Sequence, residues 1–427
     1  MPAKWLKDTV FYEIYPQSFF DTNKDGIGDI NGIIEKLDYI KSLGCNALWI
    51  NPCFDSPFKD AGYDVRDYRK VAPRYGTNND LYRLFELAHQ KGIRVLLDLV
   101  PGHTSEEHDW FKMSSKAEPN EFSGRYIWTS NWIWGCRNIP YIAGEAERSG
   151  TYLLNFFKCQ PALNYGFYQP EEPWQMPMDH PDAIATREAI KDVMRFWLSH
   201  GCDGFRVDMA ASLVKYDDEK KSGTSAIWRN VREMLDTEFP EAAMVAEWSD
   251  PKLALRCGYD ADFYLSNWGN GYEKLMREYA GHGTDQPDNS YFRKDSAHDM
   301  TAFLKEYIDW YEDTKDKGYI SLITCNHDTV RPDSTWISVS SSYATRSCSP
   351  CRACRSFTMG TKSGCAISNC PPKKAAISAP VPARPCSGRK EKTWAFPRAV
   401  PMRCTCRLIR LPTLRLWKVR NRIKRPC

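Results

Sequence analysis

Short apolar segments alternate with longer amphipathic ones along residues 8–330, and this alternation is the feature that most constrains the fold. The apolar segments are rich in β-branched and aromatic residues and the amphipathic ones end near glycines, which is typical of strands and helices respectively. Seven segments are predicted strands: VFYEIYPQSF (10–19), NALWINP (46–52), RVLLDLVP (94–101), GFRVDMA (204–210), AAMVAEW (242–248), ADFYLSN (261–267) and ISLITCNHD (320–328). Repeated units of this kind favour an α/β protein with a parallel sheet.

The amphipathic stretches between the predicted strands have helical periodicity. Apolar residues recur every three or four positions from Ile33 to Leu43, and a long stretch at 181–200 is closed by Gly201. A helix after each strand predicts a (β/α)8 TIM barrel, in which functional residues lie on the loops at the carboxyl ends of the strands.

The gap between the third and fourth predicted strands is far longer than an ordinary βα loop. Residues 102–175 occupy it and are rich in Trp, Tyr, Asn and Gly, so we predict an inserted subdomain that faces a sugar. The predicted barrel then comprises residues 1–101 and 176–332, and residues 333–427 form a tail outside both.

The composition suits a globular protein, with a hydrophobic content of 42%. No stretch approaches the roughly 18 uncharged apolar residues of a membrane span, and the first residues, MPAKWLKDTVFYEIYP, lack the cleavage pattern of a signal peptide. We therefore expect a cytoplasmic protein without a membrane partner, with reduced thiols before the tail.

Residues 334–427 differ sharply in composition from the rest of the chain. They hold 20 Lys and Arg but a single acid, Glu391, so their formal charge is +19 while that of residues 1–333 is −15. Such a segment could bind nucleic acid, and the cysteines from Cys348 to Cys354 have the two-residue gaps of a zinc site. We expect neither, because the segment has no histidine, no second well-spaced cysteine pair and no periodicity of a helix or strand.

Three acids end three of the predicted strands: Asp208, Glu247 and Asp328. Cleavage of a glycosidic bond needs one carboxylate at the anomeric carbon and a second carboxylic acid that protonates the leaving oxygen. Arg206 precedes Asp208 by two positions and would face the same side, which favours an ionised nucleophile at Asp208. Glu247 lies beside Trp248 in an apolar strand, which could raise its pKa as a proton donor requires. Each acid taken alone could equally be an ordinary strand-end partner of a salt bridge.

Six motifs in order add a family resemblance. They are GYDVRDY (62–68), DLVPGHTS (98–105), QPALN (160–164), GFRVDMA (204–210), AEW (246–248) and NHDT (326–329). On these motifs the chain resembles the α-amylase superfamily, glycoside hydrolase family 13, on its oligo-1,6-glucosidase and α-glucosidase side, over about residues 5–332.

The resemblance implies a retaining hydrolase that acts on the α-glucosidic bonds of malto- or isomalto-oligosaccharides. Asp208 would be the nucleophile, Glu247 the general acid/base and Asp328 the stabiliser of the distorted sugar. The implied sugar-binding residues are Tyr63, as a stacking platform, with Asp64, His103, Arg206 and His327. A transglycosidase or isomerase such as a trehalose synthase shares these motifs, and a non-catalytic binding protein is the alternative from another class.

A loop early in the chain has the pattern of a hard-cation site. In DTNKDGIGD, Asp21, Asn23, Asp25 and Asp29 offer oxygens at alternating positions, with a glycine for the turn. The related glucosidases carry Ca²⁺ or Mg²⁺ there, with a backbone carbonyl at about Ile27, which implies a structural ion. An Asx-rich turn without metal is the alternative.

Departures from the family pattern leave the linkage preference open. QPALN has Ala162 where many oligo-1,6-glucosidases carry Asp, and Met209 follows the nucleophile where the family has a small residue or valine. Pro101 and Gly102 stand where Asn commonly precedes His103, so the edge of the pocket is expected to differ.

A change of reading frame explains the tail. When the third base of each codon is joined to the first two of the next, residues 350–366 permit M-P-G-V-P-F-x-Y-Y-G-D-E-I-G-M-R-Y, which the family carries around its eighth strand. Some steps are forced, because the codons of Met359 and Gly360 can give only glycine in this reading. We infer an insertion or deletion near residues 332–336, with an accidental stop after Cys427.

The frame change predicts an incomplete barrel. Without an eighth strand, the first and seventh strands would expose unpaired edges. We therefore expect the eighth strand and a small C-terminal β domain to be missing or garbled, the tail to be disordered, and the chain as written to be inactive.

Overall fold

The computed structural model describes residues 2–131, 139–266, 269–276, 290–292, 299–323 and 325–329, together with the backbone of a strand at Arg355–Thr358. The rest of the tail, for which the sequence predicts disorder and the loss of a C-terminal β domain, lies outside these residues. Below, the described part is treated as one unit, Met1–Pro385.

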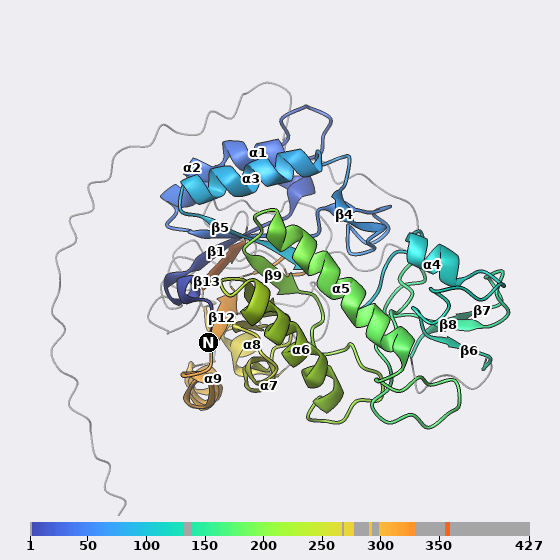
Figure 1. Cartoon of the computed structure of the whole chain (residues 1–427). Coiled ribbons are helices and arrows are strands. Elements are labelled where there is room, and N and C mark those ends of the chain that lie inside the picture. The colour runs from blue at the N-terminus through green and yellow to red at the C-terminus, as the bar shows by residue number, and fades with distance from the viewer. Residues whose placement is uncertain are drawn as a thin grey trace, which may run out of the picture. The chain divides into compact units, whose positions relative to one another are not determined.

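Eight parallel strands close into a barrel in the order β1-β13-β12-β11-β10-β9-β5-β2 (Figure 1). They are β1 (Val10–Ile14), β2 (Ala47–Ile50), β5 (Arg94–Leu99), β9 (Gly204–Val207), β10 (Ala243–Ala246), β11 (Ala261–Tyr264), β12 (Tyr319–Ile323) and β13 (Arg355–Thr358). Each of the seven predicted strands is present, so the predicted TIM barrel is confirmed.

The eighth position of the barrel is filled by tail residues. Strand β13 pairs with β1, from Val10 opposite Arg355 to Glu13 opposite Thr358, and also with β12. This corrects the expectation that β1 and β12 would expose unpaired edges. The reason is that a strand edge pairs through backbone N–H and C=O groups, which any extended segment supplies whatever its side chains.

Strand residues alternate between the inside of the barrel and the layer beneath the helices. One buried cluster holds the inward residues, among them Phe11, Ala47, Leu96 and Val245. Their sequence neighbours, such as Leu48, belong to a second cluster that packs under the helices. Two residues further toward the carboxyl end, three of these strands reach acidic side chains: Glu13 after Phe11, Asp98 after Leu96 and Glu247 after Val245.

Helices surround the barrel (Figure 1). They are α1 (Ile30–Glu35), α2 (Leu37–Ser42), α3 (Asn78–Gln90), α5 (Pro181–Ser199), α6 (Ser222–Glu238), α7 (Pro251–Arg256), α8 (Gly271–Met276) and α9 (Thr301–Thr314). The stretch with helical spacing around Ile33 is divided in two at Lys36, whose φ of −97° and ψ of 1° interrupt the helix. Helix α5 has the predicted bounds, with Pro181 in its first turn and Gly201 at φ +104° just beyond its end.

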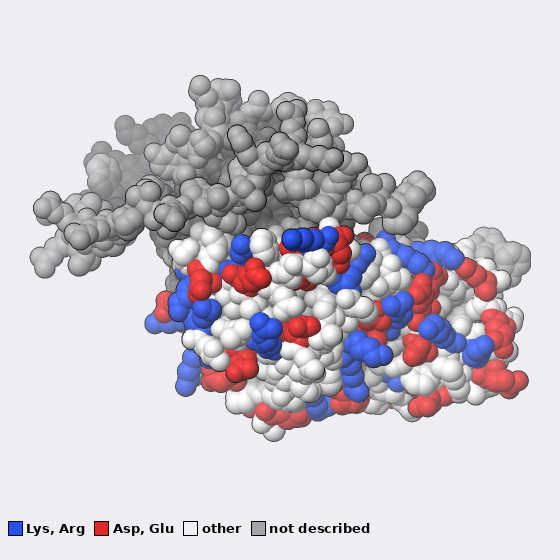
Figure 2. Space-filling view, turned by 90° about the horizontal axis from the view of Figure 1, so that it is seen from above, with Lys and Arg blue, Asp and Glu red and all other residues white. Residues whose placement is uncertain are grey.

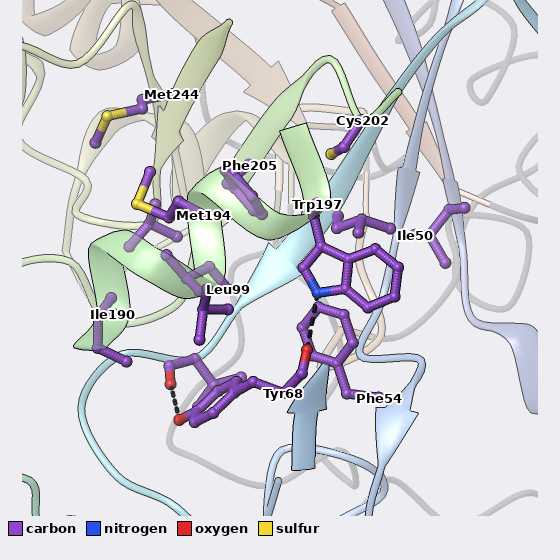
Figure 3. Packing of buried hydrophobic residues seen from close by; sticks show 14 of the residues in the cluster. Ile50, Phe54, Tyr68, Leu99, Ile190, Met194, Trp197, Cys202, Phe205 and Met244 are labelled. Atoms are coloured by element: carbon purple, nitrogen blue, oxygen red, sulfur yellow. Dashed lines mark hydrogen bonds between the residues drawn. The ribbon is translucent and has the colours of Figure 1, made fainter. Parts of the chain in front are cut away.

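The packing of α5 against the barrel centres on Trp197 (Figure 3). Its indole is fully buried and stacks on Phe54 at 5.3 Å between ring centroids. The indole N–H donates to the carbonyl of Tyr68 at 2.8 Å, and the Tyr68 hydroxyl donates to the carbonyl of Val100 at 2.7 Å. These bonds satisfy the polar atoms of two large aromatic side chains, which can therefore be buried without an unpaired donor.

Two small sheets flank the barrel. A hairpin joins β3 (Phe54–Asp55) to β4 (Asp67–Val71), and a three-stranded sheet in the segment 102–175 has the order β6-β8-β7. Its strands are β6 (Trp128–Thr129), β7 (Tyr141–Ala143) and β8 (Thr151–Leu153), next to helix α4 (Asp109–Ser114) in Figure 1. Short 3-10 helices lie at Lys4–Asp8 and Pro16–Ser18.

Acidic and basic side chains are interspersed over much of the face seen in Figure 2. Among the described residues, no helix is long and apolar enough to cross a bilayer. The six described cysteines are all buried.

Candidate active site

Arg206 organises the mouth of the barrel. Its guanidinium Nη1 donates to Asp98 Oδ1 at 2.8 Å and to Asp208 Oδ1 at 3.0 Å, and Nη2 lies 2.5 Å from Glu247 Oε1. The arginine side chain is 1% exposed and that of Asp98 is fully buried. Two of the three predicted catalytic carboxyls, Asp208 and Glu247, therefore contact the same buried cation. The contact of Arg206 with Asp208 was predicted from their spacing, whereas that with Glu247 was not.

Asp98 belongs to this site, although no role was predicted for it beyond its place in a motif. It lies directly opposite Arg206 in the β5–β9 register. Its second carboxyl oxygen accepts from the Trp49 indole and from the Tyr63 hydroxyl, each at 3.1 Å. Tyr63 and Trp49 are thus anchored to the same carboxyl that holds the arginine.

The backbone beyond β9 and β10 orients the two carboxyls predicted to be catalytic, Asp208 and Glu247. Met209 adopts φ +45°, and its N–H donates to Glu247 Oε2 at 3.0 Å. Ser249, at φ +62°, and Trp248 both donate backbone N–H groups to Asp262 Oδ1, at 3.3 and 3.0 Å. Left-handed backbone is costly for residues other than glycine, and these hydrogen bonds hold it in place.

Electrostatics distinguish the three carboxyls around Arg206. Burial raises the pKa of Asp98 to about 6 and raises that of Asp208 well above its usual range, against the opposing charge of Arg206. Burial also acts to raise the pKa of Glu247, but Arg206, the Met209 amide and His327 outweigh it and leave the pKa lowered. The sequence predicted the opposite, a raised pKa for Glu247 and an ionised Asp208. The difference arises because Arg206 lies closer to Glu247 than to Asp208.

His327 contacts the same cluster, whereas Asp328 points outward. The imidazole stacks on the Tyr63 ring at 5.2 Å and an angle of 17°, with Nε2 2.8 Å from the Tyr63 hydroxyl. Asp328 Oδ2 lies 3.3 Å from the same nitrogen, but the Asp328 side chain is 62% exposed. In this arrangement one face of Tyr63, the predicted sugar platform, is covered by the histidine.

Glu13 and Asn51 complete the cluster, and neither was among the predicted site residues. Glu13 Oε1 lies 3.0 Å from His327 Nδ1. The Asn51 amide, oriented by its hydrogen bonds, donates to Glu13 at 3.2 Å, and its oxygen lies 2.9 Å from His327 Nδ1 and 3.1 Å from the Tyr63 hydroxyl. The inward parity of β1 is the signal that could have identified Glu13.

Two predicted sugar-binding residues are occupied by contacts within their own loops. The Asp64 carboxylate accepts from Ser56 Oγ and from the backbone N–H groups of Lys59 and Asp60, at 2.9–3.0 Å. His103 Nε2 donates to the Tyr63 carbonyl at 3.0 Å, and Nδ1 accepts from the Asn155 amide at 3.0 Å. Burial lowers the pKa of His103 to about 4, so the ring is neutral.

The predicted metal loop has the form of successive Asx turns. Asp21 accepts from the N–H groups of Lys24 and Gly26, and Asn23 and Asp25 each accept from an N–H two residues further on. Asp29 caps helix α1 by accepting from the Gly32 N–H at 2.7 Å. In the part of the chain that the structure describes, no three acidic, histidine or cysteine side chains converge as a metal site, and the oxygens of this loop face its own backbone.

Comparison with known proteins agrees with the barrel fold. A family model described as "Alpha amylase, catalytic domain" matches residues 13–361. An oligo-1,6-glucosidase of Heyndrickxia coagulans is 42% identical over 51% of this chain and 38% of its own length. Trehalose synthase/amylase TreS of Mycolicibacterium smegmatis is 40% identical over 57% of this chain and 40% of its own length. An α-glucosidase of Apis mellifera is 33% identical over 78% of this chain and 58% of its own length.

Solved structures match a larger share of this chain than the curated relatives do. An isomaltulose synthase mutant of Erwinia rhapontici NX5 in complex with sucrose has a TM-score of 0.67 at 25% identity, covering 85% of this chain and 66% of that one. A trehalose-6-phosphate hydrolase of Bacillus licheniformis has a TM-score of 0.68 at 27% identity, with the same coverage. The chain spans about two fifths of the length of the first two curated relatives, 38% and 40%.

Proposed function

This chain belongs to the α-amylase family. On that premise we propose that its barrel is that of a retaining glycoside hydrolase, which acts on the α-glucosidic bonds of malto- or isomalto-oligosaccharides. The observation that carries the proposal is the Arg206 guanidinium shared by Asp208 and Glu247 at the ends of neighbouring strands. Two carboxyl groups on one side of a buried cation are the minimum that a double displacement needs.

In the proposed mechanism the Asp208 carboxylate attacks the anomeric carbon while the Glu247 carboxylic acid gives its proton to the glycosidic oxygen, so the leaving sugar departs as an alcohol. Glu247 then takes a proton from water, whose oxygen displaces Asp208 and restores both groups. The charge of Glu247 helps to raise the pKa of Asp208, and Asp208 in turn helps to lower the pKa of Glu247. A single proton shared by the pair can therefore pass from Asp208, where burial favours it in the free protein, to Glu247 for the reaction.

Asp328 is proposed to stabilise the distorted sugar, as the family motifs imply. The residues proposed to bind the sugar are Tyr63, Asp64, His103, Arg206 and His327. For Tyr63 and His327 this requires the stacked rings to separate, and for Asp64 and His103 it requires an exchange of hydrogen-bond partners. In the frame-restored protein, replacing Asp208 by Asn and Glu247 by Gln should each abolish the release of glucose from maltose and isomaltose. Unchanged turnover in either variant would overturn the assignment.

An isomerase is the second candidate, because a trehalose synthase/amylase is 40% identical over 57% of this chain. A hydrolase and an isomerase share the first half-reaction and differ in whether water or the released sugar completes the second. Separation of the products from maltose distinguishes them, since a hydrolase yields glucose and an isomerase yields trehalose.

We further propose that the reading frame is shifted near residues 332–336. The four residues that fill the eighth strand, Arg355–Thr358, are those that read F-x-Y-Y in the alternative frame, within the segment the family carries at that strand. The number of residues between β12 and β13 is therefore the same in the two reading frames, whereas the side chains of β13 differ. On this proposal full activity belongs to the frame-restored protein, and the chain as written is inactive.

We also propose a structural Ca²⁺ or Mg²⁺ at the loop of Asp21, Asn23, Asp25, the Ile27 carbonyl and Asp29, which would require these oxygens to turn from the backbone toward one point. The alternating oxygens and Gly26 at φ +90° support this assignment. Cytoplasmic location is likewise proposed, since Cys53, Cys159, Cys202 and Cys257 are buried free thiols.

A further inference from the structure

A buried acid and a buried histidine from opposite ends of the barrel sequence meet at its mouth. Glu13 lies on β1, the first strand, and His327 follows β12, the seventh strand in chain order. Glu13 Oε1 and His327 Nδ1 are 3.0 Å apart, and the side chains are 1% and 8% exposed. Since both groups are withdrawn from water, their protonation states are set by what surrounds them.

The surroundings of Nδ1 are hydrogen-bond acceptors. One is the Glu13 carboxylate. The other is the Asn51 amide oxygen at 2.9 Å, because this amide is oriented with its nitrogen toward Glu13 and the Ile14 carbonyl. A ring nitrogen that faces two acceptors carries a proton.

The surroundings of Nε2 lead to the same result. Tyr63 has one hydroxyl proton, and its acceptors are Asp98 Oδ2 and the Asn51 amide oxygen, each 3.1 Å away. The hydroxyl oxygen therefore accepts from His327 Nε2 at 2.8 Å. The Asp328 carboxylate, 3.3 Å away, is a second acceptor. With a proton on both nitrogens, the ring is an imidazolium.

The charges around the ring differ in sign. Burial and the Arg206 charge oppose protonation of His327, whereas the hydrogen bond to Glu13 and the charges of Glu13 and Asp328 favour it, and its pKa is raised on balance. The histidine in turn helps to lower the pKa values of Asp98 and Glu247. Asp328 is largely exposed, so Glu13 is the buried charge that compensates the imidazolium.

We infer that Glu13 is a positioning residue that keeps His327 as an imidazolium against Tyr63, where the ring supplies a second positive charge, beside Arg206, to the catalytic carboxyls. This deepens the proposed function of the same site, since it assigns the residue that sets the charge of a sugar-binding histidine. The charge state exists in the free protein, so it can be tested without turnover.

The test is a ¹⁵N-histidine NMR titration of the full-length chain, in which the His327 signal among the eight histidines is identified by its loss in His327→Gln. We expect both ring nitrogens of His327 to be protonated at pH 6.5, where a free histidine is about half charged. In Glu13→Gln, which keeps the size and the acceptor but removes the charge, the titration should shift to lower pH.

Asp260→Asn is the matched control, because Asp260 is a carboxyl of similar burial that bonds the Ala3 and Met244 N–H groups and Arg232 instead of a histidine. It should leave the His327 titration unchanged. A neutral His327 at pH 6.5 in the wild-type chain would overturn the inference even if Glu13→Gln failed to fold, as would equal titrations in the wild type and a folded Glu13→Gln. A raised His327 pKa, together with no glycosidase activity in the frame-restored protein, would support the inference and count against the proposed function alone.

Discussion

Replacing Arg206 by Met should be among the most destabilising changes the chain can suffer. The arginine is 1% exposed and contacts three carboxyls, Asp98, Asp208 and Glu247, at 2.5–3.0 Å. Methionine fills much of the volume but leaves these acids buried without a cation. Removing one partner of a buried ion pair costs about 3–5 kcal/mol, and here three acids share the lost partner, so the upper part of that range is expected.

The loss should depend on pH in a defined direction. Without Arg206 the carboxyl pKa values rise above those of the unfolded chain, so the folded state binds more protons than the unfolded one. The free energy of unfolding of Arg206→Met should therefore fall as pH rises from 5 to 8, and the difference from the wild type should be largest at the alkaline end.

Urea unfolding followed by tryptophan fluorescence at pH 5, 6.5 and 8 measures this difference. Arg195→Met is the matched control, because Arg195 also pairs with two acids, Asp192 and Glu238, at 2.8 Å but on the exposed side of α5. It should change the free energy of unfolding little. An Arg206→Met variant within about 1 kcal/mol of the control, or one whose loss does not vary with pH, would refute the reasoning.

Three further predictions concern stability. Burial lowers the pKa values of His103 and His108 to about 4. The free energy of unfolding should therefore fall by roughly 3 kcal/mol per histidine as pH falls from 6.5 to 4. Changing both histidines to Gln should remove this part of the pH dependence, as measured by urea unfolding. Gly204→Ala should lower the free energy of unfolding by about 2–4 kcal/mol, because its φ is +145° and a Cβ would lie 2.1 Å from the Ala243 carbonyl oxygen. Gly92→Ala, at φ +69° with open space around it, is the control and should lower it by about 1 kcal/mol. Equal melting temperatures of the two variants would contradict this prediction. Millimolar Ca²⁺ should raise the melting temperature of the wild type but not of Asp25→Ala, and an equal response in both would exclude the proposed loop site.

The barrel was predictable because its signal is local. Apolar strand residues, helical spacing and the long gap before α5 all lie in short windows of sequence. The pairing of β13 was not predictable, since RSFT carries no strand pattern and its contacts with β1 and β12 are made by the backbone.

The site was predictable only as far as motifs place residues. Arg206 and Asp208 lie two positions apart on one strand, and their contact followed from that spacing. The contact of Asp98 with Arg206 crosses 108 residues, and that of Glu13 with His327 crosses 314, so neither pairing is visible in a short window. Motifs also say where a side chain lies but not which way its polar atoms turn.

The central claim is that a family hydrolase is encoded here and is broken by its reading frame. We would express the chain as written beside a version with the frame restored near residue 333, and measure the release of glucose from maltose and isomaltose by both. The account predicts activity in the restored protein only, and lost again on Asp208→Asn. Equal activity in the chain as written would contradict it.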